Sequence, residues 1–192
     1  LSEDTFSYDD SPVFAPITPL IGAKKGVYQL RELSEDSRTV NAVPTSAELG
    51  ELDFDMAGKS VEARPVFVNS SAGCTVFPLQ RGAVDALPGE YRLLYGLVYD
   101  NKLKKMVAGI IPGEKTPPVT IKAGEKTKLR FGGPYKVTYS LEYKGEAMTI
   151  PLDSIRLIGI AGEEYVALNL LDAPRVALLI DGKSRSWGEF SN

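Results

Sequence analysis

Paired carboxylates are the side chains of this chain that could most directly carry chemistry. They are Asp9 with Asp10, Asp53 with Asp55, and Glu163 with Glu164. Such pairs can bind calcium or act as general acid and base. None of them lies in the dense Asp-rich loop that supplies six or more oxygen ligands to calcium. We therefore predict no metal site, while a glycosidase pair from distant parts of the chain stays open.

Histidine is absent from the 192 residues, and Cys74 is the single cysteine. The absence removes Ser-His-Asp and Cys-His catalysis and His-ligated zinc. One cysteine cannot form an internal disulfide, and within AGCTVF it is expected to be a small buried apolar residue. We predict a protein that is not an enzyme and has no cofactor, with a carboxylate-dependent hydrolase as the third-ranked function.

Charge and hydropathy restrict the partners. The chain has 22 basic and 25 acidic residues with the two signs interspersed, so it lacks the basic patch of a nucleic-acid-binding protein. No apolar run reaches the ~18 residues of a membrane span. We therefore expect no nucleic-acid partner and no membrane span in this chain. The partner itself is unknown, and it could be a protein or a glycan.

Three tyrosines spaced four apart could bind a ligand or fill a core. Tyr135, Tyr139 and Tyr143 lie in GGPYKVTYSLEYKG (132–145), with Val137 and Leu141 between them. Every odd position from 135 to 143 is apolar or aromatic, and every even position is polar. This alternation predicts one half-buried strand. The polar face should meet water, so the rings are expected to be covered, in the core or between modules.

A ligand platform is the alternative interpretation of these rings. Carbohydrate-binding sandwiches often expose flat aromatic side chains, and Trp187 near the C-terminus could contribute one. The candidate ligand-binding residues are Tyr135, Tyr139, Tyr143 and Trp187. We predict no catalytic, cofactor-binding or metal-binding residue.

Further strands are predicted by alternating or short apolar runs bounded by Gly and Pro turns. GEYRLLYGLVYD (89–100) is apolar on one face and partly apolar on the other, which is typical of a central strand. The others are EKTKLRFG (125–132), PPVTIKAG (117–124), DSIRLIGIAG (153–162), EEYVALNLL (163–171) and PRVALLIDG (174–182). Asp181-Gly182 is a candidate hairpin turn. TSAELGEL (45–52) is the only short helix expected, so the predicted class is all-β.

Gly132-Gly133-Pro134 interrupts the strand pattern and is the predicted module boundary. It divides the chain into a lead-in plus β-sandwich module (1–132) and a second, smaller β module (133–192). A weak internal repeat would instead place the boundary near residue 84.

Two segments resemble a known family. DALPGEYRLLYG (85–96) and VTIKAGEKTKLRF (119–131) are similar to strand-entry motifs of transthyretin-like and carboxypeptidase-regulatory-like (Ig-like) β-sandwich modules of exported bacterial proteins. The resemblance implies two Ig-like or transthyretin-like antiparallel β-sandwich modules in an exported protein, periplasmic or at the cell surface. Members of this family mostly serve as spacers, adhesion or binding modules. The expected function is thus a non-catalytic structural or binding module, with a carbohydrate-binding module that uses exposed tyrosines as the alternative.

Overall fold

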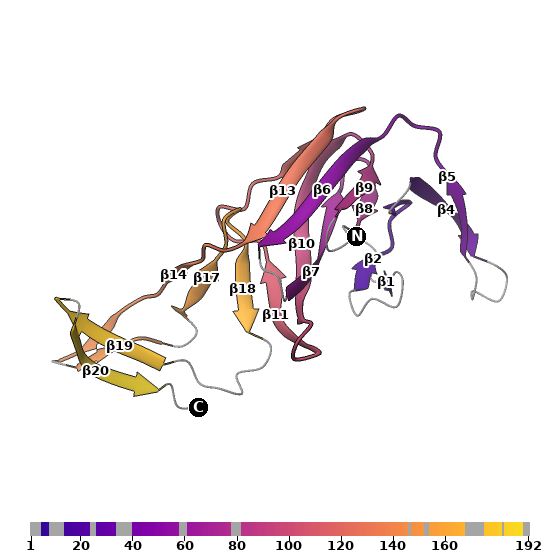
Figure 1. Ribbon diagram of the computed structural model, residues 1–192. Helices are drawn as coiled ribbons and strands as arrows, with labels where there is room; N and C mark the ends of the chain where they lie inside the picture. The colour runs from indigo at the N-terminus through magenta and orange to yellow at the C-terminus, as the bar shows by residue number, and fades with distance from the viewer. Residues whose placement is uncertain are drawn as a thin grey trace.

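The computed structural model is built from β-strands joined by turns and loops (Figure 1). It describes residues 5–7, 14–23, 26–33, 40–57, 61–77, 82–145, 147–151, 154–167, 175–181 and 183–189. No α-helix occurs among these residues. The all-β class predicted from the alternating patterns is therefore confirmed.

The strands follow one another in this order: β1 (Thr5–Ser7), β2 (Phe14–Pro16), β3 (Leu20–Gly22), β4 (Val27–Leu33), β5 (Val40–Pro44), β6 (Gly50–Ala57), β7 (Val61–Asn69), β8 (Cys74–Val76), β9 (Gly82–Ala86), β10 (Gly89–Asp100), β11 (Lys105–Ile111), β12 (Val119–Ile121), β13 (Lys126–Gly132), β14 (Lys136–Thr138), β15 (Glu142–Lys144), β16 (Ala147–Thr149), β17 (Arg156–Ile158), β18 (Glu164–Ala167), β19 (Arg175–Ile180) and β20 (Lys183–Glu189). All six segments predicted above as further strands contain one of these.

A long main sheet and a short covering sheet build the body of the molecule. The main sheet has the order β14-β17-β18-β11-β10-β7-β8-β3-β4-β5, with β12 also paired to β10, and the covering sheet has the order β13-β6-β9. Figure 1 shows β13 and β6 in front of β10 and β7. The pairs β13–β6 and β3–β8 are parallel, so the expectation of purely antiparallel sheets was wrong.

The main hydrophobic core fills the space between these two sheets. Phe131 of β13 meets Phe54 of β6 edge-to-face at a ring-centroid distance of 5.3 Å and approaches Phe67 of β7 at 6.0 Å. All three side chains are buried. On β6 the buried Phe54 alternates with Asp53 and Asp55, as the DFD pattern predicts for a strand.

Strand β10 has apolar contacts on both faces, which confirms its predicted central position. Tyr91 and Leu93 belong to the main core, whereas Leu94 and Tyr95 pack on a second cluster around Ile21, Val66 and Phe77. A register shift between Leu93 and Tyr95 moves the later side chains to the other face.

The prediction of a short helix at 45–52 was wrong. Residues 45–49 are irregular, and β6 begins at Gly50. A side chain at position 50 would collide with the backbone of Lys122, so glycine permits the close approach of two chain segments there.

Alkaline pH should destabilise the fold because two phenols are enclosed. Burial raises the pKa of Tyr91 and of Tyr165 above the ordinary value of about 10. A raised pKa favours the protonated phenol in the folded state, so stability is intact below pH ~10 and falls above it. Two phenols give a loss of about 2.7 kcal/mol per pH unit in that range.

Urea unfolding at several pH values above about 9 measures this loss. Tyr91→Phe should reduce the loss by about 1.4 kcal/mol per pH unit. Part of the pH dependence remains, because the pKa values of Tyr165, Tyr135 and Cys74 are also raised. Tyr143→Phe, which changes an exposed ring, should leave it unchanged. An unaltered pH dependence in Tyr91→Phe would contradict the assignment.

Candidate binding site on the two faces of strand β14

Strand β14 lies at one end of the main sheet. The chain leaves the covering sheet at the end of β13, passes through Gly132-Gly133-Pro134, and pairs as β14 with β17. The main sheet thus continues across the predicted module boundary, because β17 pairs with β18 and β18 with β11. Alternation along β14 sends Lys136 and Thr138 to one face and Val137 to the other.

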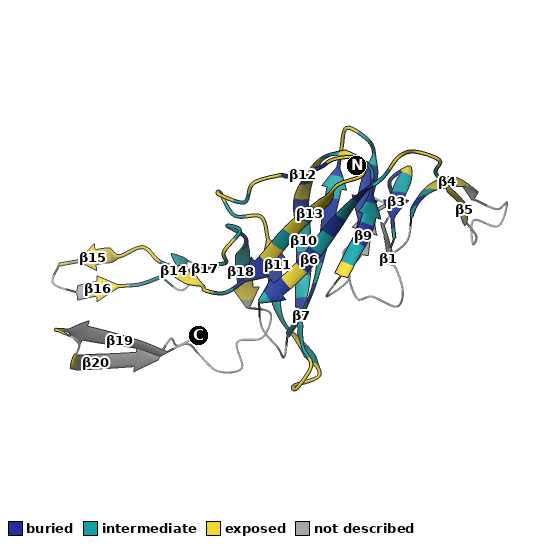
Figure 2. Ribbon diagram, turned by 45° about the horizontal axis from the view of Figure 1, so that its top comes forward, coloured by how far each residue is buried: buried dark blue, intermediate teal, exposed yellow. Residues whose placement is uncertain are grey.

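The face that carries Val137 is the core-facing side of the main sheet. Val137 lies opposite Leu157, Leu157 opposite Tyr165, and Tyr165 opposite Ile110. Ile110 and Tyr165 are buried, yet Val137 is 56% exposed. The covering sheet ends at β13 and does not extend over β14 (Figures 1 and 2). The apolar face of the main sheet therefore continues onto β14 without a second sheet packed against it.

The predicted burial of the three tyrosines was therefore wrong. Tyr135, Tyr139 and Tyr143 are 46%, 56% and 68% exposed. The predicted single strand is divided into β14 and β15 by irregular backbone at residues 139–141. β15 pairs only with β16 in the described part of the chain, and Tyr143 lies opposite Met148, which is also exposed, across that hairpin.

We call these exposed apolar residues the apolar strip. Its members are Tyr135, Val137, Tyr139, Leu141, Tyr143 and Met148. In Figure 2 the β15–β16 hairpin extends away from the body of the molecule. The strip therefore combines aromatic and aliphatic side chains on a projecting part of the chain.

Tyr135 connects the strip to the buried interior. Its ring meets Tyr165 edge-to-face at a centroid distance of 5.2 Å. Partial burial, and to a smaller degree the Glu163 carboxylate, raises the pKa of Tyr135. The strip thus begins on a rigid aromatic contact and becomes more exposed towards Tyr143.

Glu163 is a fully buried carboxylate that fixes the turn between β17 and β18. Its Oε1 accepts hydrogen bonds from the Gly132 N–H at 2.7 Å and from the Tyr165 hydroxyl at 2.8 Å. Its Oε2 accepts one from the Ala161 N–H at 3.0 Å. Three donors thus satisfy a side chain that makes no ion pair within the described residues. Glycine is required at 159 because a Cβ there would collide with this carboxylate.

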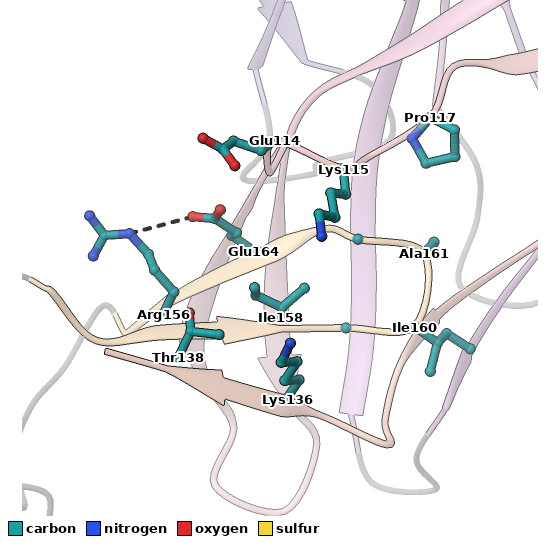
Figure 3. A pocket seen from close by; sticks show the side chains of 12 residues that line it. Glu114, Lys115, Pro117, Lys136, Thr138, Arg156, Ile158, Ile160, Ala161 and Glu164 are labelled. Carbon is teal, nitrogen blue, oxygen red and sulfur yellow. Dashed lines mark ion pairs between the residues drawn. The ribbon is translucent and has the colours of Figure 1, made fainter. Parts of the chain in front are cut away.

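A cavity of about 860 Å³ lies on the opposite, outer face of β14 (Figure 3). Lys136 and Thr138 of β14, Arg156 and Ile158 of β17, Glu164 of β18 and Lys115 of the β11–β12 loop line it. The sequence pattern assigned Lys136 and Thr138 to a face in open water. No sequence signal placed Lys115 beside them, because the loop that carries it is adjacent only in the folded chain.

The two carboxylate pairs in the described part of the chain do not form an acid–base site. Glu163 and Glu164 are consecutive, so Glu163 is buried while Glu164 reaches the cavity and pairs with Arg156 at 3.6 Å. Asp53 and Asp55 lie within 3.7 Å of Lys126 and Arg130, respectively. Asp9 and Asp10 lie outside the described residues.

The remaining candidates are placed as follows. Trp187 lies in β20 opposite Ala177, and its side chain is outside the described part. Across the described ranges there is no cluster of three or more side chains suited to a metal. Within the same ranges, no helix has the length and apolar character needed to cross a membrane.

Comparison with protein-family models, curated proteins and solved structures finds no match to this chain.

Proposed function

We propose that this protein is a non-catalytic binding module whose apolar strip contacts a partner protein. The observation that carries the proposal is the contrast between a closed core and six exposed apolar side chains on one projecting segment. Exposed apolar side chains gathered on one segment are typical of interaction sites. We further propose, from the sequence motifs, an Ig-like or transthyretin-like module of an exported bacterial protein; the all-β, two-layer body is compatible with the module type.

The mixture of side chains favours a protein partner over a sugar. Tyrosine rings can stack on either, but Val137, Leu141 and Met148 offer aliphatic surface that complements another apolar side chain. The edge position of β14 adds main-chain groups, since its described pairing is with β17 alone. An extended apolar segment of a partner could therefore add to this edge as a further strand.

Selection of extended peptides with alternating apolar residues tests this proposal. The wild-type protein should bind such peptides, and Val137→Lys should weaken binding by about tenfold or more, because an edge lysine opposes strand addition. Tyr143→Ala should also weaken it. Leu103→Lys, which changes an exposed apolar residue in the β10–β11 turn, is the matched control and should bind normally.

A carbohydrate-binding module is the second candidate, because three phenol rings are exposed where the sequence predicted burial. A glycan array decides between the two. Two results together would overturn the protein-partner proposal in favour of the sugar. The wild-type protein would select no peptide, and it would bind a neutral glycan that Tyr139→Ala no longer binds.

A further inference from the structure

The cavity on the outer face of β14 carries an uncompensated positive charge. Three cationic and two anionic side chains line it, and Arg156 is paired with Glu164. Among the described residues, no ion pair involves Lys115, Lys136 or Glu114. Figure 3 shows Lys115 and Lys136 reaching into the cavity from opposite sides. Two ammonium groups that share one hollow repel each other, and an anion between them removes that cost.

The loop that carries Lys115 is fixed by main-chain packing. The Thr116 hydroxyl accepts a hydrogen bond from the Gly113 N–H and donates one to the Gly162 carbonyl, both at 2.8 Å. Gly162 has a φ of +81°, and a Cβ there would lie 2.7 Å from the Lys115 carbonyl carbon. The β11–β12 loop and the β17–β18 turn therefore touch backbone to backbone, so the base of Lys115 is positioned without a ligand.

The β17–β18 turn offers the cavity no free main-chain amides of the kind that cradle phosphate. The N–H groups of residues 159, 160, 161 and 162 donate to the Glu163 carbonyl, the Gly132 carbonyl, the Glu163 carboxylate and the Gly159 carbonyl, respectively. On this side of the cavity an anion would be bound by side chains: the two ammonium groups and the Thr138 hydroxyl. Ile158, Ile160 and Pro117 add an apolar wall for the carbon skeleton of a ligand.

We propose that this cavity binds a small organic carboxylate, such as an acidic sugar unit or an acidic peptide side chain. Lys115 and Lys136 bind the carboxylate, and the apolar wall contacts the rest of the ligand. The site is on the other face of β14 from Val137, so it uses different side chains from those of the apolar strip.

Titration by two-dimensional NMR with trigalacturonate and with a Glu-rich hexapeptide tests the site in the full chain. At least one probe should shift the signals of residues 115, 136 and 138. Maltotriose should not shift them, and inorganic phosphate should bind more weakly than that probe because it has no carbon skeleton to contact the apolar wall. Binding should weaken as salt is raised. The double variant Lys115→Gln/Lys136→Gln should bind about tenfold more weakly or worse, because two charge-assisted contacts are lost.

The double variant Lys102→Gln/Lys128→Gln is the matched control. It removes the same net charge from the β10–β11 turn and from β13, so it should retain binding. Both changed pairs are exposed lysines, which keeps the fold intact. Equal weakening in the two double variants, or no binding of either carboxylate probe at millimolar concentration, would overturn the proposal.

Discussion

Replacing Glu163 with alanine should lower the free energy of unfolding by about 4 kcal/mol, because two buried donors and one part-buried donor lose their acceptor at about 1–3 kcal/mol each. The donors are the N–H groups of Gly132 and Ala161 and the hydroxyl of Tyr165. Water that enters the vacated space would recover part of the loss. Glu163→Gln should cost about 1–3 kcal/mol, since its amide nitrogen cannot accept the third hydrogen bond.

The adjacent Glu164→Ala is the matched control for this experiment. Glu164 makes an ion pair with the half-exposed Arg156 at 3.6 Å, and pairs of this kind contribute at most about 1 kcal/mol. Urea unfolding of the four proteins should therefore give the order wild type, Glu164→Ala, Glu163→Gln, Glu163→Ala, from most to least stable. Equal costs for the two alanine variants would show that the buried hydrogen bonds do not hold the β17–β18 turn.

Sequence patterns predicted the strands because side-chain alternation is a local property. The polar residues Lys126, Lys128 and Arg130 of β13 are exposed, and Phe131 is buried, as the pattern required. The turn at Asp181 was also predicted: Ile180 pairs with Lys183, and Asp181 has the positive φ of +53° that such hairpins need. Local chemistry was sufficient in both cases.

The packing of the covering sheet on the main sheet could not be predicted, since it depends on contacts between segments that are distant in sequence. The alternation assigned Val137 to the apolar face of its strand, but it carried no information on its partner Leu157 or on where the covering sheet stops. The bulge after Leu93 was missed for a similar reason, because a single extra residue changes the face without changing composition. The cavity was missed because its lysines come from a loop and a strand that only the fold brings together.

The position of the core can be tested by comparing one phenylalanine with two tyrosines. Phe131→Ala should lower the free energy of unfolding by about 3–5 kcal/mol, because it opens a cavity between the two sheets. Phe131 is fully buried and contacts both Phe54 and Phe67. Tyr139→Ala and Tyr143→Ala should each cost less than about 0.5 kcal/mol, since their rings are mostly exposed.

The same comparison connects stability with the proposed function. If the two tyrosine variants unfold at the urea concentration of the wild type, then any loss of peptide binding in them reports on the contact surface and not on folding. Phe131→Leu keeps an apolar side chain in the same space and should recover more than half of the stability lost in Phe131→Ala. A cost of 2 kcal/mol or more for Tyr139→Ala would place that ring in a packed environment and remove the apolar strip as an interaction surface.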